Sequence, residues 1–262
     1  MDISKVALVV HDGKPKAVDL QASLTEYFGA RGISVDDDAD LVVSLGGDGT
    51  MLRAARLAHS LDAPLLGVNL GVLGYLSEID PPKAHEALDR IFDGAFEIEE
   101  RLMLSCTTRS KGAEISFIGL NEVLVERSGT HRLVRLGVRI GGESLGAFNA
   151  DGVIVATPTG STAYALSAGG PIVSPRAQCL ILVPVSAHMI FSRPFVLSAD
   201  ETVEITVEGD QVASLSLDGA EGCSVGAGAP VSVQRAERPL RLVRLGGPGF
   251  VERLRVKLDL PV

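Results

Sequence analysis

The stretch LVVSLGGDGTMLRAA, Leu41 to Ala55, decides the fold of the first part of the chain. An apolar run leads into a glycine-rich turn, and a helical pattern follows. α/β proteins often build phosphate-binding sites in this way, because the free N–H groups at a helix start attract anions. This turn also carries a carboxylate, Asp48, which must have some other role. On spacing alone, Asp48 could simply be an acidic residue favoured at a helix N-terminus.

Strands and helices alternate on both sides of this turn. The expected strands are Val6–Val10, Leu41–Leu45 and Leu65–Asn69, and the expected helices are Pro15–Ala30, Thr50–Ser60 and Pro82–Phe92. This alternation predicts an α/β domain over residues 1–96, with a Rossmann-like parallel sheet. The glycine turn then lies at the carboxyl end of a strand, where open α/β sheets bind their ligands.

From Phe96 onward the sequence becomes rich in short, alternating apolar runs. The expected strands are Ile115–Ile118, Val123–Glu126, Leu133–Ile140, Val153–Thr157, Leu180–Val185, Val203–Val207 and Val231–Gln234. They predict a β-rich, sandwich-like domain over residues 97–245, with one helical insertion at Ser161–Ala168. The tail, about residues 246–262, contains a helical pattern at Phe250–Leu258 and is expected to pack back on the first domain.

Composition excludes several kinds of partner. The 262-residue chain has a net charge of −9 and no Lys/Arg run, which argues against nucleic acid. No apolar run approaches the ~20 residues that span a bilayer, so no membrane partner is expected. The three cysteines are far apart, which favours buried thiols and a cytoplasmic location. None of the six lysines is near the glycine turn, so backbone amides, a few arginines and a divalent cation would have to bind any polyanion.

A second stretch, NADGVIVATPTGSTAYALSAGGP from Asn149 to Pro171, carries a turn crowded with hydroxyls. A purely structural interpretation makes Ser161 a helix cap and Tyr164 a core residue. That interpretation does not explain the whole turn, because one cap does not require four hydroxyls and a proline. The Walker phosphate-binding pattern and the G-x-G-x-x-G fingerprint are both absent from the sequence.

LGGDGT, LNEV at Leu120–Val123 and DGVIVATPTGSTAYALSAGGPIV at Asp151–Val173 together resemble the NAD kinase family. Shorter matches support the resemblance: NLGVLGYL (Asn69–Leu76), HMIFSRP (His188–Pro194) and SLDG (Ser216–Gly219). It implies an enzyme that transfers the terminal phosphoryl group of ATP, or of polyphosphate, to the 2′-hydroxyl of the adenosine ribose of NAD. The product is NADP.

The resemblance also implies roles for particular residues. Asp48 would be the catalytic proton acceptor, and Asp151 would meet the nicotinamide end of NAD, with a contact across a subunit boundary as one arrangement. The implied NAD contacts are Asp48, Gly49, Arg53, Tyr75, Asn121, Glu122, Arg132, Asn149, Asp151, Thr162, Ala163, Tyr164, Ala165, Leu166, Ser167 and Ala187. His188 is a further candidate, with a structural histidine as the alternative. A homodimer or homotetramer is expected.

Chemistry is consistent with the role of Asp48. The ribose hydroxyl must lose its proton as it attacks phosphorus, and a carboxylate within hydrogen-bond reach can accept that proton. Mg²⁺ or another divalent cation would neutralise the donor phosphates. The sequence has no dense carboxylate cluster, so the cation is expected to arrive with ATP, and no metal-binding residue of the protein is predicted.

Two other functions compete with this one. GGDGT alone also resembles lipid and sphingoid kinases, but these leave the TPTGSTAY run unexplained. A non-catalytic dinucleotide sensor is suggested by Ala220, where the family usually has glutamine, and by Asn149, where a basic residue is frequent. Ala187 and Met189 also replace common family residues beside His188. The intact Asp48 and Glu122 argue against a sensor.

Overall fold

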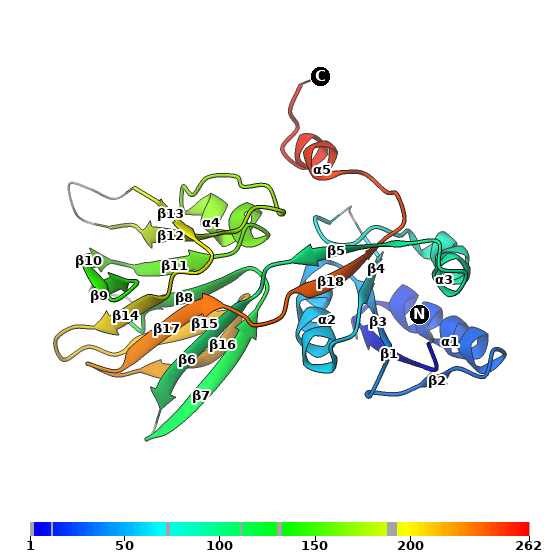
Figure 1. Ribbon diagram of the computed structural model, residues 1–262, viewed down its shortest axis with the longest axis horizontal. Helices are drawn as coiled ribbons and strands as arrows, with labels where there is room; N and C mark the ends of the chain where they lie inside the picture. The colour runs from blue at the N-terminus through cyan, green and yellow to red at the C-terminus, as the bar shows by residue number, and fades with distance from the viewer. Residues whose placement is uncertain are drawn as a thin grey trace. The chain divides into compact units, whose positions relative to one another are not determined.

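The computed structural model describes residues 3–11, 13–71, 74–110, 112–129, 133–187 and 193–261. The chain forms two compact units, each with its own core (Figure 1). The first unit consists of Met1–Arg101 and Leu240–Val262, and the second of Leu102–Pro239.

A six-stranded sheet forms the centre of the first unit, in the order β2-β1-β3-β4-β18-β5. Its strands are β1 (Lys5–Val10), β2 (Ser34–Val35), β3 (Leu41–Gly46), β4 (Leu65–Asn69), β5 (Glu97–Arg101) and β18 (Leu240–Arg244). All neighbours are parallel except β5, which pairs antiparallel to β18. The predicted parallel sheet is therefore present, with one antiparallel strand at its edge.

Helices cover both faces of this sheet (Figure 1). They are α1 (Pro15–Gly29), α2 (Asp48–Leu61) and α3 (Ala84–Phe92), with a 3₁₀ turn, η1 (Pro81–Lys83), before α3. The C-terminal helix α5 (Phe250–Lys257) lies away from the sheet (Figure 1). Leu24 of α1 and Leu88 of α3 pack in one apolar cluster, whereas α2 lies on the opposite side of β3. Because both of its faces are covered, every residue of β3 is buried.

The unit boundaries differ from the predicted 96 and 245 by one strand at each junction. β5 and β18 pair with each other, and β18 also pairs with β4, so both strands belong to the first sheet. β5 has the sequence EIEER, which is too charged to predict a strand. These charged side chains are compatible with a strand here because β5 lies at the edge of the sheet and its side chains are mostly exposed.

The second unit contains two six-stranded sheets with antiparallel neighbours, in the orders β10-β9-β14-β17-β6-β7 and β13-β12-β11-β8-β15-β16. Its strands are β6 (Leu104–Ser110), β7 (Ala113–Gly119), β8 (Glu122–Arg127), β9 (Val134–Ile140), β10 (Glu143–Ala150), β11 (Gly152–Ala156), β12 (Cys179–Val185), β13 (Phe195–Ser198), β14 (Val203–Val207), β15 (Ala213–Leu217), β16 (Ala220–Val225) and β17 (Pro230–Arg235). The prediction that the second part of the chain is β-rich is confirmed.

Alternate side chains from both sheets fill one common core, which includes Leu136 and Val138 from β9 and Val153 and Val155 from β11. The other face of the second sheet is covered by a 3₁₀ turn, η2 (Gly160–Thr162), and a short helix, α4 (Tyr164–Ser167). The predicted helical insertion is thus two short pieces. Because β11 is covered on both faces, it is buried along its whole length and gives the turn after it a rigid base.

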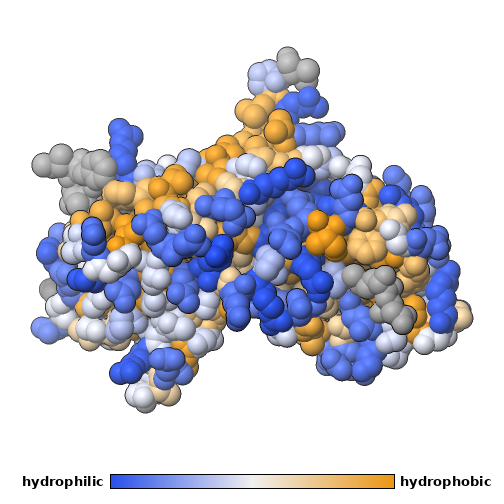
Figure 2. Space-filling model, viewed as in Figure 1, coloured by the Kyte–Doolittle hydropathy of each residue, from blue (hydrophilic) through white to orange (hydrophobic). Residues whose placement is uncertain are grey.

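Hydrophilic side chains predominate on the face drawn in Figure 2, with apolar side chains exposed on α5. Val251 and Val256 of α5 are 75% and 59% exposed. No helix among the described residues is long and apolar enough to cross a membrane.

Candidate active site

The glycine turn between β3 and α2 is shaped by two different requirements. A Cβ at Gly46 would lie 2.2 Å from Thr50 Oγ1, so packing allows only glycine there. At Gly47 and Gly49 a Cβ would meet nothing within 4 Å. These two glycines instead leave open space at the start of α2, where the first N–H groups have no partner within the helix.

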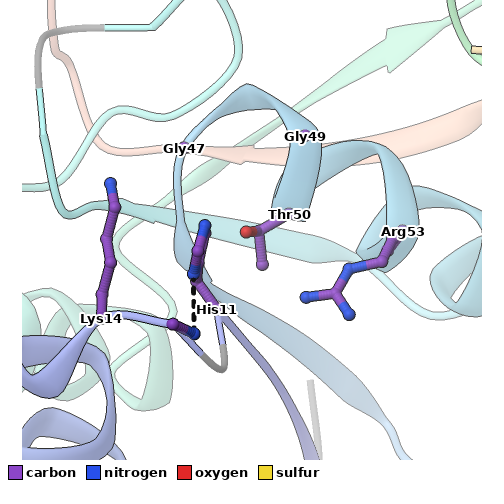
Figure 3. A pocket seen from close by; sticks show the side chains of 7 residues that line it. His11, Lys14, Gly47, Gly49, Thr50 and Arg53 are labelled. Atoms are coloured by element: carbon purple, nitrogen blue, oxygen red, sulfur yellow. Dashed lines mark hydrogen bonds between the residues drawn. The ribbon is translucent and has the colours of Figure 1, made fainter. Parts of the chain in front are cut away.

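That open space is part of a cavity of about 470 Å³ (Figure 3). Its lining residues are His11, Gly13, Lys14, Gly47, Gly49, Thr50 and Arg53. Arg53 Nη2 donates to the Val10 carbonyl at 2.7 Å, and the Gly13 N–H donates to His11 Nδ1 at 3.1 Å. The charged side chains in this lining are basic, so the cavity suits an anionic ligand.

The expectation that no lysine lies near the glycine turn is wrong, because Lys14 lines the same cavity as Gly47 and Gly49. Lys14 follows β1, and β1 pairs in parallel with β3. The loops after two adjacent parallel strands meet at one edge of the sheet, even when they are far apart in the sequence.

Asp48 does not cap α2 through its side chain. The N-cap residue is Gly47, and no side-chain capping hydrogen bond is present. Instead, Asp48 Oδ2 accepts a hydrogen bond from the Tyr75 N–H at 3.3 Å, while Oδ1 is buried with no hydrogen-bond partner in the described part of the chain. A Cβ at Gly74 would lie 2.1 Å from Oδ1, so this carboxylate is closely packed.

The first unit therefore brings together four of the predicted site residues, Asp48, Gly49, Arg53 and Tyr75. Burial, and secondly the charge of Asp48, raise the pKa of Tyr75 above its ordinary value. Tyr75 and Asp48 are thus close enough to interact electrostatically, in addition to the backbone hydrogen bond.

In the second unit, the turn before β8 is organised by Asp218. The Asp218 carboxylate accepts hydrogen bonds from the N–H groups of Leu120 (2.8 Å), Asn121 (2.7 Å) and Glu122 (3.1 Å). Asp218 and Gly219 both have positive φ, at 50° and 72°, and connect β15 to β16. This compact hairpin turn presents the carboxylate to the turn that carries Asn121 and Glu122.

Glu122 is 7% exposed, and its Oε2 has no hydrogen-bond partner among the described residues. Burial, and secondly the charge of Asp218, raise the pKa of Glu122 from 4.5 to about 7. The side chain can therefore accept or donate a proton near neutral pH.

This raised pKa predicts a pH-dependent stability. The folded protein holds the Glu122 proton more tightly than the unfolded chain does, so stability is lost as pH rises from about 4.5 to 7. Relative to wild type, Glu122→Gln should gain roughly 3 kcal/mol of unfolding free energy between pH 4.5 and 8. Urea unfolding at both pH values measures this gain. Glu114→Gln, at an exposed position of β7, is the control, and an equal pH dependence in all three proteins would contradict the prediction.

Hydrogen bonds join the hydroxyl-rich turn after β11 to the turn that carries Asn121 and Glu122. Thr157 Oγ1 donates to the Leu120 carbonyl at 2.6 Å and accepts from the Gly160 N–H at 3.0 Å. The Thr157 N–H donates to the Asn121 carbonyl at 2.8 Å. The three turns around Asn121, Thr157 and Asp218 therefore lie together in the fold. Leu120 and Asp218, which are hydrogen-bonded, are 98 positions apart in the sequence.

Within this turn, some predicted residues face outward and others pack inward. Tyr164 is 41% exposed, so its alternative interpretation as a core residue is wrong. Ala165 is the fully buried residue of α4 and packs in the apolar cluster beneath that helix, so only its backbone could contact a ligand. Ser161 is also buried: its Oγ donates to the Pro158 carbonyl and accepts from the Val173 N–H, which ties the turn together. Thr162, Ala163 and Leu166 are half-buried, and Ser167 is exposed.

The remaining predicted residues lie elsewhere. Asp151 precedes β11 and forms an ion pair with Arg127, at 2.6 Å from Nε to Oδ1. Asn149 is exposed on β10, and Ala187 is half-buried after β12. Arg132 and His188 lie outside the described residues. The five residues of β11 separate Asp151 from the hydroxyl-rich turn by about 17 Å at ~3.3 Å per residue.

No site for a bound metal is evident in the parts of the chain that the structure describes. They contain no group of three or more His, Cys, Asp or Glu side chains that could hold an ion.

A basic cavity at a helix start, with a half-buried carboxylate beside it, is the arrangement expected of a phosphoryl-transfer site. Comparison with known proteins gives the family. Residues 30–96 match the model of the ATP-NAD kinase N-terminal domain, and residues 120–245 match that of the ATP-NAD kinase C-terminal domain. The chain belongs to the NAD kinase family, and the resemblance inferred from sequence is confirmed.

Individual relatives agree with this assignment. The chain is 38% identical to an NAD kinase of Geotalea daltonii, over 98% of both chains, and 42% identical to one of Corynebacterium glutamicum, over 86% of this chain and 79% of the other. Among solved structures, an Archaeoglobus fulgidus NAD kinase in complex with ATP is similar with a TM-score of 0.73 and 27% identity, over 98% and 96% of the two chains. A yeast NADH kinase has a TM-score of 0.90 at 22% identity, over 98% and 88%, which shows a common fold.

Proposed function

We propose that the protein transfers the terminal phosphoryl group of ATP to the 2′-hydroxyl of the adenosine ribose of NAD, which gives NADP. The observation that carries this proposal is the basic cavity beside Asp48. Lys14, Arg53 and the N–H groups at the start of α2 supply positive charge for the donor phosphates. The complex of the similar Archaeoglobus fulgidus enzyme with ATP supports ATP as the donor.

In the proposed reaction, the ribose oxygen forms a bond to the terminal phosphorus, and the bond from that phosphorus to the bridging oxygen of ADP breaks. The hydroxyl proton passes to the Asp48 carboxylate. Mg²⁺ enters as part of the Mg–ATP substrate and neutralises the phosphate charge that Asp48 would otherwise repel. Gly47 and Gly49 leave room for a ligand next to the backbone.

We assign the binding of NAD to the converging turns of the second unit. Asn121 and Glu122 would hold the adenosine part, and the exposed residues around α4, such as Tyr164 and Ser167, would contact the adenine and its ribose. The two departures from the family pattern, Asn149 and Ala220, are both exposed on strands. Neither belongs to the hydrogen-bond network around Asp218, which supports an active enzyme over a dinucleotide sensor.

Incubation of the protein with NAD and Mg–ATP, followed by an assay for NADP, tests the function. We expect NADP and ADP in equal amounts. Binding of NAD without turnover would favour the sensor instead, and phosphorylation of a lipid alcohol in place of NAD would favour a lipid kinase. Replacing ATP by inorganic polyphosphate in the same assay determines the range of donors.

We further propose a homodimer or homotetramer. The sheets of the second unit end in β7, β10, β13 and β16, and such edge strands need to be covered or paired. Asp151 lies at the opposite end of β11 from the hydroxyl-rich turn, so a second copy could supply it to the nicotinamide end of a bound NAD. Sedimentation at micromolar concentration should give a dimer or tetramer. A monomer with full activity would overturn this proposal.

Other expectations from the sequence stay predictions. The strand order β2-β1-β3-β4, with a helix after β1 and after β3, supports a Rossmann-like first unit. A cytoplasmic location rests on the three separated cysteines, and the absence of a nucleic-acid partner rests on the net charge of −9.

A further inference from the structure

The fully buried side chain of the C-terminal helix α5 is a charged one, while its apolar side chains are partly or largely exposed. Its valines, Val251 and Val256, are largely exposed, whereas Arg253 is 2% exposed and is the buried residue of the helix. Removing a guanidinium group from water is costly unless its N–H groups find acceptors. The partners of Arg253 therefore determine where α5 can dock.

Those partners are backbone carbonyls on both sides of a short loop. Arg253 Nη1 donates to the carbonyls of Gly74 at 3.0 Å and Ser77 at 2.5 Å, and Nε donates to Pro248 at 2.9 Å. The residues from Gly74 to Ser77 are called the 74–77 segment below. Arg253 thus connects the beginning of α5 to both ends of the 74–77 segment.

The 74–77 segment is also the part of the chain that holds Asp48. The Tyr75 N–H donates to Asp48 Oδ2, and Gly74 packs closely against Oδ1. A second contact from α5 reaches the same segment, because Lys257 Nζ lies 5.7 Å from the centre of the Tyr75 ring. Movement of α5 would therefore be transmitted to the Asp48 carboxylate.

Charge and burial join Arg253 to Asp48 as well. Burial and, secondly, the charge of Arg244 lower the pKa of Arg253, and the carboxylates of Glu78, Glu99 and Asp48 act against that lowering. Three polar atoms around the 74–77 segment, Asp48 Oδ1, Ser77 Oγ and Arg253 Nη2, are buried and have no hydrogen-bond partner among the described residues.

We propose that Arg253 is a positioning residue for Asp48: it fixes the 74–77 segment, which in turn fixes the carboxylate that accepts the ribose proton. The inference rests on the proposed role of Asp48 in the reaction. Arg253 does not contact the substrates in this proposal, so its effect on turnover must pass through Asp48.

Arg253→Ala should lower kcat by roughly 10–100-fold, the effect of a displaced catalytic group, and should change the KM for NAD much less than kcat, because Tyr75 is the one expected NAD contact in the 74–77 segment. Arg253→Lys should lose part of that activity, because an ammonium group cannot reproduce the fork of guanidinium donors. Guanidinium chloride, far below the concentration that unfolds the protein, should restore part of the activity of Arg253→Ala. The matched control is Arg255→Ala, at an exposed position of the same helix.

A double-mutant cycle separates this proposal from that for Asp48. If Arg253 acts through Asp48, Arg253→Ala should cause little further loss of kcat in an Asp48→Asn background. Independent, multiplicative losses would overturn the positioning role while leaving the role of Asp48 intact. Full activity of Asp48→Asn alone would instead overturn the proposed function of Asp48. Equal activities of Arg253→Ala and Arg255→Ala would also refute the proposal.

Discussion

Asp48→Asn should lower kcat by roughly 10²–10⁴-fold, the range for loss of a general base. Asparagine keeps the shape of the side chain and its oxygen can still accept the Tyr75 N–H, but its amide cannot take the ribose proton. The KM for NAD should change little, because the proposed NAD contacts are mostly in the second unit. A helix-capping role would predict normal activity, but the N-cap of α2 is Gly47 and Asp48 makes no capping hydrogen bond.

Steady-state kinetics with NAD and Mg–ATP measure this effect, and thermal unfolding verifies that the variant is folded. Asp19→Asn, at an exposed position of α1, is the matched control for loss of a negative charge. If the carboxylate mainly positions Mg²⁺, excess Mg²⁺ should recover part of the lost rate. Near-normal turnover in a folded Asp48→Asn protein would remove Asp48 from the mechanism and make Glu122 the next carboxylate to test.

The sequence predicts best those elements whose local pattern and final environment agree. β3 and β4 are continuous apolar runs that become buried on both faces, and α2 follows a glycine turn that only a strand-to-helix connection explains. β11 is predicted for the same reason, since α4 covers one of its faces and the sandwich core the other. In these cases burial of apolar surface, the largest favourable term in folding, already favours the local structure.

Strands with one exposed face or an interrupted register are harder to predict. β10 begins with four exposed residues, and its register shifts between Ser144 and Gly146, where Gly146 has φ of 126°. The hairpin of β15 and β16 could have been recognised from Asp218–Gly219, because Asp-Gly is a strong signal for a two-residue hairpin turn. The same two residues end the family motif SLDG.

Residues that contact the site from distant positions in the sequence are hard to predict for a related reason. Lys14 reaches the glycine turn because β1 and β3 are neighbours, and Asp218 reaches Asn121 because β15 pairs with β8. Neither contact produces a local pattern. Motif reasoning therefore finds side chains on the turns themselves, whereas the side chains that hold the turns become visible only when the sheet order is known.

Gly160→Ala should disrupt the turn to which NAD binding is proposed, because the added methyl group meets backbone atoms. A Cβ at Gly160 would lie 2.0 Å from the Asn121 carbonyl oxygen and 2.5 Å from its carbon. Both are backbone atoms, so no side-chain rotation can relieve the overlap, and the two turns must move apart. The hydrogen bonds from Thr157 to Leu120 and Asn121 would then be strained or lost.

We expect the unfolding free energy to fall by about 3 kcal/mol, as for severe overpacking, and kcat/KM for NAD to fall roughly 10²-fold. Calorimetric titration with NAD and urea unfolding measure the two effects. Gly226→Ala is the control, because a Cβ there meets nothing within 4 Å. Asp48→Asn should keep NAD affinity and lose turnover, whereas Gly160→Ala should lose affinity first. Unchanged NAD affinity in Gly160→Ala would show that contact between these two turns does not form the NAD site, and the adenosine contacts would have to be sought elsewhere in the second unit.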